Sequence, residues 1–129
     1  MFKYQRTIRL SETDATGALY FSELLKLATE TFEAFLISKG FSLHQMIERE
    51  DFSMPIVNAQ AEFFSPLKVG DQVDIHLHLS HKGTSSFTLA TSMQLKGREA
   101  GKTSIVHVVV SKKTGKSMPI PSQVLQLLA

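Results

Sequence analysis

Apolar and polar residues alternate along several segments of the chain, and this two-residue period predicts β-strands. In residues 2–10 the apolar side chains occupy even positions, so this segment is expected to be the first strand. Later strands are expected over residues 54–64, 73–80, 87–95 and 102–112. Residues 105–110 within the last of these are nearly all apolar, which is typical of a central strand buried on both faces.

Turn signals separate the later strands. They lie at Val69-Gly70-Asp71, at Lys82-Gly83-Thr84 and from Gly97 to Gly101. Because these connections are short, the strands that they join are expected to pair antiparallel.

A different period follows the first strand and predicts a long buried helix. Its apolar positions recur at Leu24, Leu25, Ala28, Thr31, Phe32, Phe35 and Leu36. Gly40 is expected to end this helix in a left-handed conformation. Ser42 and Gln45 have the spacing of a capping box and predict a short second helix through about Glu50. Ser122 is expected to cap a short helix at the end of the chain.

The order of elements is one strand, a long helix, a short helix and four long strands. An antiparallel sheet packed on one buried helix defines an α+β fold. The 129 residues are expected to form a single domain over 1–129, and a hydrophobic content of 43% is enough for a core.

Composition removes several classes of function. The chain has no cysteine, which excludes disulfides, thiolate metal sites and cysteine nucleophiles and favours a cytoplasmic location. A net charge of +2, without a basic run, does not favour nucleic acid as a partner. No segment approaches the roughly 18 apolar residues of a membrane-spanning helix, and residues 1–6 do not have the pattern of a secretion signal.

The main candidate for chemistry is the segment between the first strand and the long helix, residues 12–21. It places a carboxylate, Asp14, among small residues just before the helix begins. A helix start offers unpaired backbone N–H groups and a partial positive charge. A carboxylate beside such donors could attack an acyl carbonyl or activate the water that attacks it. The alternative is that Asp14 only stabilises its own turn.

Other ionisable residues are weaker candidates. Glu30 and Glu33 share a helix face and could supply a catalytic carboxylate. His76 and His78 point to the same side of a strand, but without a third ligand they indicate a polar sheet face and no metal site. His107 lies in the apolar strand and is expected to be an interior or interface histidine.

Two segments carry a resemblance to a known family. Thr13-Asp14-Ala15-Thr16-Gly17-Ala18-Leu19-Tyr20-Phe21 resembles the active-site segment of the 4-hydroxybenzoyl-CoA thioesterase family, and residues 63–71 resemble its strand-then-turn segment. The resemblance implies the hotdog fold, in which an antiparallel sheet wraps around one long central helix. Residues 54–59 and the Tyr20-Phe21 pair look most like the 1,4-dihydroxy-2-naphthoyl-CoA thioesterase branch. Bacterial short-chain acyl thioesterases of the family usually carry histidine where Phe21 stands.

The resemblance assigns roles to the loop residues. It implies that Asp14 is the nucleophile or the general base, two roles that the sequence does not separate. It implies that Phe21 contributes its backbone N–H to the thioester oxygen. Gly17 is expected to allow a tight turn or close substrate approach. Tyr20 either lines the acyl pocket or is a core tyrosine with a satisfied hydroxyl.

The substrate and partners are implied in the same way. The expected activity is hydrolysis of an aromatic acyl-CoA in menaquinone or phylloquinone synthesis, without a cofactor, by a homodimer or homotetramer. Lys82, Ser85 and Ser86 are the candidates for holding coenzyme A, and Arg98 and Lys102 could also reach a phosphate. The alternatives are a thioesterase for aliphatic acyl-CoA or acyl-carrier protein, and a hotdog module that binds acyl ligands without cleaving them.

Overall fold

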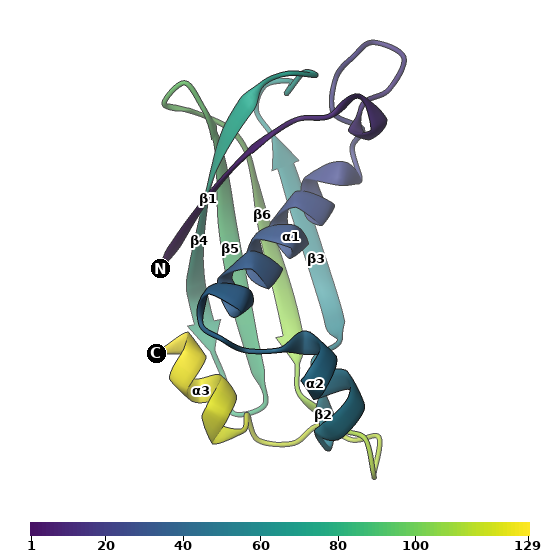
Figure 1. Cartoon of the computed structure of the whole chain (residues 1–129), viewed down its shortest axis with the longest axis vertical. Coiled ribbons are helices and arrows are strands. Elements are labelled where there is room, and N and C mark those ends of the chain that lie inside the picture. Colours follow the sequence, from purple (N-terminus) through teal and green to yellow (C-terminus); the bar gives the residue numbers. More distant parts are fainter.

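The computed structural model describes residues 1–129 and has an antiparallel sheet that curves around one long helix (Figure 1). The five strands of this sheet are β1 (Phe2–Thr7), β3 (Ile56–Phe63), β4 (Gln72–Lys82), β5 (Ser86–Leu95) and β6 (Arg98–Val108). A separate two-stranded sheet joins β2 (Phe52–Ser53) and β7 (Val110–Ser111). The helices are the 3-10 turn η1 (Leu10–Glu12), the central α1 (Glu23–Ser38), α2 (Leu43–Arg49) and α3 (Ser122–Leu128). The predicted α+β class is confirmed.

The strand order is β1-β4-β5-β6-β3, with every neighbouring pair antiparallel. Strands β4, β5 and β6 follow one another as hairpins, as their short turns predict. Strand β3 does not pair with β4, the next strand in the chain, but crosses to the far edge and pairs with β6. Both β1 and β3 therefore have one edge without a partner strand.

The predicted alternation matches the inner face of the sheet. Val73, Ile75 and Leu77 of β4 are buried, and so are the odd-numbered residues 87–93 of β5. Helix α1 covers this face with a buried stripe to which the structure adds Leu27, a position outside the predicted stripe. Since the buried residues of α1 contact both halves of the sheet, this helix is the centre of the core.

The predicted helix ends are largely confirmed. Gly40 is left-handed with φ +74°, and the Phe41 N–H donates to the Leu36 carbonyl at 3.0 Å, which completes a Schellman C-cap. Ser42 caps α2 by accepting a hydrogen bond from the Gln45 N–H at 3.1 Å. The prediction for Ser122 is wrong, because Pro121 holds the N-cap position and Ser122 is already helical.

The first strand is shorter than the predicted residues 2–10, since β1 ends at Thr7. After Thr7 the chain leaves the sheet, and Leu10 is 73% exposed at the start of η1. The alternation failed here because an apolar residue at the correct spacing has no neighbouring strand to pair with.

The predicted turn from Gly97 to Gly101 is also too long. The turn consists of Lys96 and Gly97, both with positive φ, as in a two-residue hairpin loop. Gly101 lies inside β6, where an added Cβ would come within 3.0 Å of Leu24 and 3.1 Å of the Glu62 carbonyl. The glycine therefore allows α1 to pack close to the sheet.

The two ends of the molecule are closed differently (Figure 1). Helices α2 and α3 and the β2–β7 pair lie at one end. At the other end, the segment that leads into α1 lies beside the connection from β3 to β4. No helix has the combination of length and apolar character needed to span a bilayer.

Candidate active site

The segment before α1 folds into a compact hydrogen-bonded loop. The Asp14 N–H donates to the Ala18 carbonyl at 2.9 Å, and the Gly17 N–H donates to the Asp14 carbonyl at 3.0 Å. Gly17 has φ +79°, a conformation that a residue with a side chain rarely adopts, which agrees with the predicted tight turn. Thr13 and Leu19 form a β-bridge across the base of the loop. The loop therefore presents Asp14 from a defined backbone.

Two further hydrogen bonds attach this loop to the β3–β4 connection. The Leu19 N–H donates to the Leu67 carbonyl at 2.7 Å, and the Val69 N–H donates to the Gly17 carbonyl at 3.1 Å. The two segments that carry the family resemblance, far apart in the chain, are thus in direct contact.

The Asp14 side chain is exposed, and its two oxygens differ. Oδ1 accepts hydrogen bonds from the Thr16 hydroxyl at 2.6 Å and from the Thr16 N–H at 2.8 Å. Oδ2 accepts none within the chain. The hydrogen bond from the Thr16 hydroxyl, followed by that from its backbone, holds the pKa of Asp14 below its ordinary value. Asp14 thus stabilises its own turn, as the alternative reading proposed, and still keeps one ionised oxygen free.

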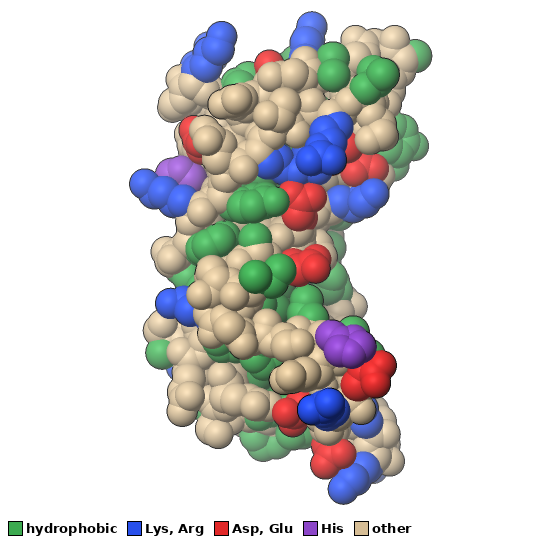
Figure 2. All heavy atoms as spheres, viewed as in Figure 1, with side chains coloured by type: hydrophobic (Ala, Val, Ile, Leu, Met, Phe, Trp, Pro, Cys, Tyr) green, Lys and Arg blue, Asp and Glu red, His purple; other side chains and the backbone are tan.

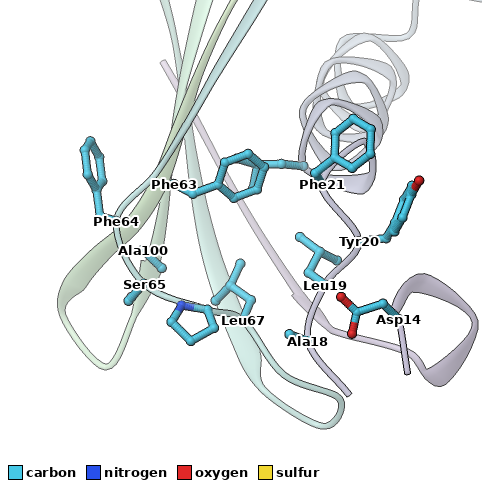
Figure 3. Close-up of a pocket in the computed structure, with 12 residues that line it drawn as sticks. Asp14, Ala18, Leu19, Tyr20, Phe21, Phe63, Phe64, Ser65, Leu67 and Ala100 are labelled. Carbon is cyan, nitrogen blue, oxygen red and sulfur yellow. The ribbon is translucent and has the colours of Figure 1, made fainter. Parts of the chain in front are cut away.

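Asp14 borders a cleft of about 480 Å³ between this loop and the end of β3. Figure 3 shows the carboxylate turned inward toward Leu19, while Phe63 projects from the sheet side toward Phe21. The cleft is lined mainly by apolar side chains, with Asp14 as its charged group. The lining residues are Asp14, Ala18, Leu19, Tyr20, Phe21, Leu24, Phe63, Phe64, Ser65, Pro66, Leu67 and Ala100.

Four aromatic side chains around the cleft are open to solvent. Tyr20, Phe21, Phe63 and Phe64 are 48%, 66%, 50% and 51% exposed. The Tyr20 and Phe21 rings are in contact, with centroids 4.7 Å apart. Of the two alternatives for Tyr20, the core position is wrong, since Tyr20 lines the cleft, is half exposed and has no hydrogen bond at its hydroxyl. Exposed apolar patches of this kind are typical of interaction surfaces and ligand-binding grooves.

Phe21 lies just outside the helix. Ser22 is the N-cap of α1 and Glu23 its first residue, so Phe21 precedes the cap. Its N–H donates no hydrogen bond within the chain, although the flanking Tyr20 N–H donates to the Glu12 carbonyl at 2.9 Å. Phe21 and Asp14 both line the cleft, and the Phe21 N–H and the Asp14 Oδ2 make no hydrogen bond within the chain.

The structure does not bring the predicted coenzyme A residues to this cleft. Lys82, Ser85 and Ser86 lie at the β4–β5 hairpin, at the opposite end of the sheet from the Asp14 loop (Figure 1). Lys102 is nearer, with its Nζ 5.8 Å from the centre of the Phe64 ring. Within one chain, the acid and the predicted coenzyme A residues are thus separated by the length of the sheet.

The helix carboxylates are not available as alternatives in this cleft. Glu30 accepts hydrogen bonds from Arg6 and Tyr4, which hold it on the β1 side of α1. Glu33 is exposed on the same helix and lines no part of the cleft. Asp14 is the acid that the fold places at the apolar opening.

The histidines also lie outside the cleft. His107 is 7% exposed, its Nδ1 lies 2.9 Å from the Met54 carbonyl oxygen, and its ring stacks on Phe87. Burial lowers the pKa of His107, partly opposed by the contact with the Met54 carbonyl. This confirms an interior histidine. His76 and His78 belong to no group of three or more side chains placed to hold a metal ion.

Sequence reasoning missed part of the site. Thr16, which binds Asp14, and the rings of Phe63 and Phe64 were not assigned a role from the pattern. A threonine two residues after an aspartate is a recognisable turn signal. The phenylalanines gave no such signal, because their position beside Asp14 depends on how β3 pairs.

A loop acid beside an apolar cleft, on a sheet wrapped around one helix, agrees with what the resemblance to the thioesterase family implies. The model of the Thioesterase-like superfamily matches residues 8–128, and the chain belongs to this family. The hotdog fold expected from the resemblance is confirmed.

The relatives are more specific. The chain is 33% identical to the 1,4-dihydroxy-2-naphthoyl-CoA hydrolase of Rippkaea orientalis over 99% of this chain and 95% of the relative, and 33% identical to that of Prochlorococcus marinus over 93% and 82%. The structure of a 1,4-dihydroxy-2-naphthoyl-CoA thioesterase from Synechocystis superimposes with a TM-score of 0.93 at 26% identity, covering 98% and 94% of the two chains. A gentisyl-coenzyme A thioesterase superimposes with a TM-score of 0.88 at 26% identity, covering 99% and 100%. The two hydrolases and the Synechocystis thioesterase carry the name of the branch that the sequence resembles, that of 1,4-dihydroxy-2-naphthoyl-CoA.

Proposed function

We propose that this protein hydrolyses an aromatic acyl-CoA thioester, with 1,4-dihydroxy-2-naphthoyl-CoA of menaquinone or phylloquinone synthesis as the leading substrate. The observation that carries the proposal is that Asp14, with Oδ2 free of hydrogen bonds in the chain, lines an apolar cleft together with Phe21, whose N–H also has no partner in the chain. The names of the relatives support the same activity.

Asp14 supplies the carboxylate. It attacks the thioester carbon and expels the coenzyme A thiolate, leaving an anhydride that water hydrolyses, or it takes a proton from the water that attacks. Because its pKa is low, Asp14 is ionised at neutral pH and ready for either role. The reaction consumes only water and the thioester, so the proposal includes no cofactor.

The Phe21 N–H would donate a hydrogen bond to the thioester oxygen and stabilise the negative charge that develops there. A backbone donor without a partner in the chain needs no rearrangement to do so, and removing one donor of this kind costs roughly 10²–10³-fold in rate. Tyr20, Phe21, Phe63 and Phe64 would contact the acyl ring, because aromatic faces and edges pack on one another.

The direct test is a panel of thioesters measured with the purified chain. We expect the largest kcat/KM for 1,4-dihydroxy-2-naphthoyl-CoA, followed by 4-hydroxybenzoyl-CoA and gentisyl-CoA, with aliphatic acyl-CoA and acyl-carrier-protein thioesters much slower. Gentisyl-CoA belongs in the panel because a thioesterase for it shares this fold at 26% identity. A preference for aliphatic thioesters would contradict the substrate class, and binding without release of coenzyme A would contradict the enzymatic function.

The proposal includes a homodimer or homotetramer. Strand β3 has one edge without a partner strand, and it exposes Ile56, Val57 and Phe63. Long unpaired edges of this kind are usually covered in native proteins. Antiparallel pairing of two β3 strands would place the Asp14 end of one chain near the β4–β5 hairpin of the other. Lys82, Ser85 and Ser86 could then hold the coenzyme A of the substrate bound by the neighbouring chain.

Subunit complementation tests this arrangement. Asp14→Asn chains and chains carrying Lys82→Ala, Ser85→Ala and Ser86→Ala are each expected to be impaired. Mixed after dissociation, they would form hybrid dimers with one intact site, and activity would return. Light scattering reports whether the assembly is a dimer or a tetramer. No recovery in proven hybrids would contradict a site shared between chains.

The proposal also places the protein in the cytoplasm, where coenzyme A thioesters are made and used. Cell fractionation followed by detection of the chain tests this location.

A further inference from the structure

Arg6 of β1 uses its whole guanidinium group in hydrogen bonds within the chain. Its Nε donates to Glu30 at 2.7 Å, and its Nη1 donates to the Thr7 carbonyl at 2.9 Å and to Glu12 at 2.7 Å. Its Nη2 donates to the second oxygen of Glu12 and to Glu30 at 3.2 Å. A guanidinium has five N–H donors, so none is left for a ligand.

Both carboxylates have further hydrogen bonds, although the Glu30 side chain is 39% exposed. Only 14% of the Arg6 side chain and 12% of the Glu12 side chain are exposed, and Glu12 also accepts the Arg9 N–H at 2.8 Å. Glu30 accepts the Tyr4 hydroxyl at 2.8 Å. Burial is the largest single influence on both carboxyls and opposes their ionisation. The hydrogen bonds and charge of Arg6, together with the Arg9 N–H at Glu12 and the Tyr4 hydroxyl at Glu30, still leave the pKa of each below its ordinary value. We refer to Arg6, Glu12 and Glu30 as the Arg6 clamp.

The clamp joins three elements, β1, η1 and α1. Arg6 lies on β1, Glu12 ends η1 two residues before Asp14, and Glu30 lies on the second turn of α1. Basic and acidic side chains lie side by side in the region where β1 leads to η1 beside the start of α1 (Figures 1 and 2). The loop that carries Asp14 is thus tied to the helix through side chains that do not line the cleft.

Backbone hydrogen bonds extend the clamp to the reacting groups. The Glu12 carbonyl accepts the Tyr20 N–H at 2.9 Å, and the Tyr20 carbonyl accepts the Glu23 N–H at 2.9 Å. Tyr20 precedes Phe21, whose free N–H faces no acceptor in the chain. Glu12 therefore fixes both ends of the loop, the end that leads to Asp14 and the end that leads to Phe21.

We propose that Arg6 is a positioning residue for the thioester hydrolysis, and that through Glu12 and Glu30 it sets the separation between the Asp14 carboxylate and the Phe21 N–H. This inference rests on the proposed function. Arg6 touches no substrate. A displacement of about 1 Å between reacting groups can cost roughly a hundredfold in rate, so a clamp of this kind matters for the chemical step.

The clamp requires arginine, because a guanidinium group is planar and presents its N–H donors as a fork. Two carboxylates are bound on two edges of one guanidinium, each by a pair of hydrogen bonds. Lysine keeps the charge but offers a single ammonium group, so it holds one carboxylate well and releases the other. Arg6→Lys thus separates the geometry of the clamp from its charge.

The test compares Arg6→Lys, Arg6→Met, Glu12→Gln and Glu30→Gln with the wild type. We expect Arg6→Lys to lower kcat roughly a hundredfold, with KM within about threefold, because the cleft that binds the acyl group is intact. Arg6→Met should lower kcat at least as much, and the two glutamine variants, which keep one acceptor oxygen, should lose less. Amide hydrogen exchange at Tyr20 and Asp14 should be about tenfold faster in Arg6→Lys, with the β4 to β6 amides unchanged.

Two controls separate positioning from general stability. Glu33→Gln makes the same chemical change as Glu30→Gln on the same helix, at an exposed side chain without an ion pair, and should leave kcat unchanged. Lys112→Met removes the hydrogen bonds of Lys112 to the Met46 and Ile47 carbonyls at the other end of the molecule. It should lower the melting temperature without changing kcat.

Unchanged kcat and unchanged exchange in Arg6→Lys would overturn the proposal. So would a loss of kcat that Lys112→Met reproduces at an equal loss of melting temperature, because the effect would then be one of stability. A wild-type chain inactive on every thioester would overturn the proposed function instead, and the exchange rates would still support or overturn the clamp.

Discussion

The two ends of α1 are packed in opposite ways. At its C-terminal end Phe32 and Phe35 are buried in a cluster with Phe87, and α2 and α3 close that cluster. At its N-terminal end, Phe21 and Phe63 are at least half exposed around a cleft. The same residue type thus forms the core at one end and lines an open cleft at the other.

This difference in packing indicates that one end of α1 contributes mainly to stability and that the other is open to a ligand. We call the C-terminal end of α1 the closed end and its N-terminal end the open end. Buried rings with contacts on all sides contribute to the free energy of folding, whereas half-exposed rings beside a carboxylate leave room for a ligand. If this division holds, substitutions at the closed end change stability and substitutions at the open end change activity.

The largest effect is expected for Asp14→Asn at the open end. Asparagine keeps an acceptor oxygen for the Thr16 hydrogen bonds, so the loop and the melting temperature should be preserved. The nucleophile or base is lost, and kcat should fall roughly 10²–10⁴-fold. Hydrolysis of 1,4-dihydroxy-2-naphthoyl-CoA measures this, with Asp51→Asn, which alters an exposed ion pair at the closed end, as the control. Turnover near that of the wild type would remove Asp14 from the mechanism.

Phe87→Ala tests the closed end. Phe87 is fully buried between Phe32 and His107, with ring centroids 6.1 and 5.1 Å away. Urea unfolding followed by circular dichroism should show a loss of about 3–5 kcal/mol, while kcat of the folded fraction stays near that of the wild type.

Phe64→Ala is the matched substitution at the open end. Because Phe64 is half exposed, its removal should change the free energy of unfolding by only about 0.5 kcal/mol but raise KM for an aromatic thioester.

If Phe87→Ala abolished turnover in the folded protein, the division between the two ends would be wrong.

The smallest effect is expected for Thr16→Val. The Thr16 hydroxyl helps to hold the pKa of Asp14 below its ordinary value, so the ionised, active form persists at more acidic pH. Valine removes this hydrogen bond and keeps that of the Thr16 N–H. The pKa of Asp14 should rise toward its ordinary value, and the acid limb of the kcat/KM profile should move to higher pH. At neutral pH Asp14 is ionised in both proteins, so the rate there should be nearly the same. An acid limb that does not move would show that another group controls it.

Much of the fold could be predicted from local pattern. The alternation in β4 and β5, the stripe of α1, and the caps at Gly40 and Ser42 depend on residues close together in the chain. The errors arose where contacts between distant segments decide the local structure. Leu10 has the spacing of a strand residue but no strand to pair with, and Gly101 looks like a turn residue but makes room for Leu24.

The candidate site divides in the same way. The residue types and spacing of the Asp14 loop, together with the family resemblance, were sufficient to predict the acid, the glycine turn and the class of protein. The partner segment of the cleft was not predictable, because Phe63 and Phe64 reach it only through the crossing of β3 to the far edge of the sheet. The same applies to the separation of Lys82 from Asp14, which depends on the direction of β4.

The sequence by itself determined the periods of the elements and the turn around Asp14, since these follow from residues within a few positions of one another. It also determined membership of the family, which rests on motifs spread along the chain. Only the tertiary structure decided that Oδ2 of Asp14 is free, that Glu30 is held by Arg6, and that four aromatic rings remain open at one end of α1. Hydrogen bonds and burial between distant segments depend on strand order and helix placement, and the local pattern of a chain does not specify these.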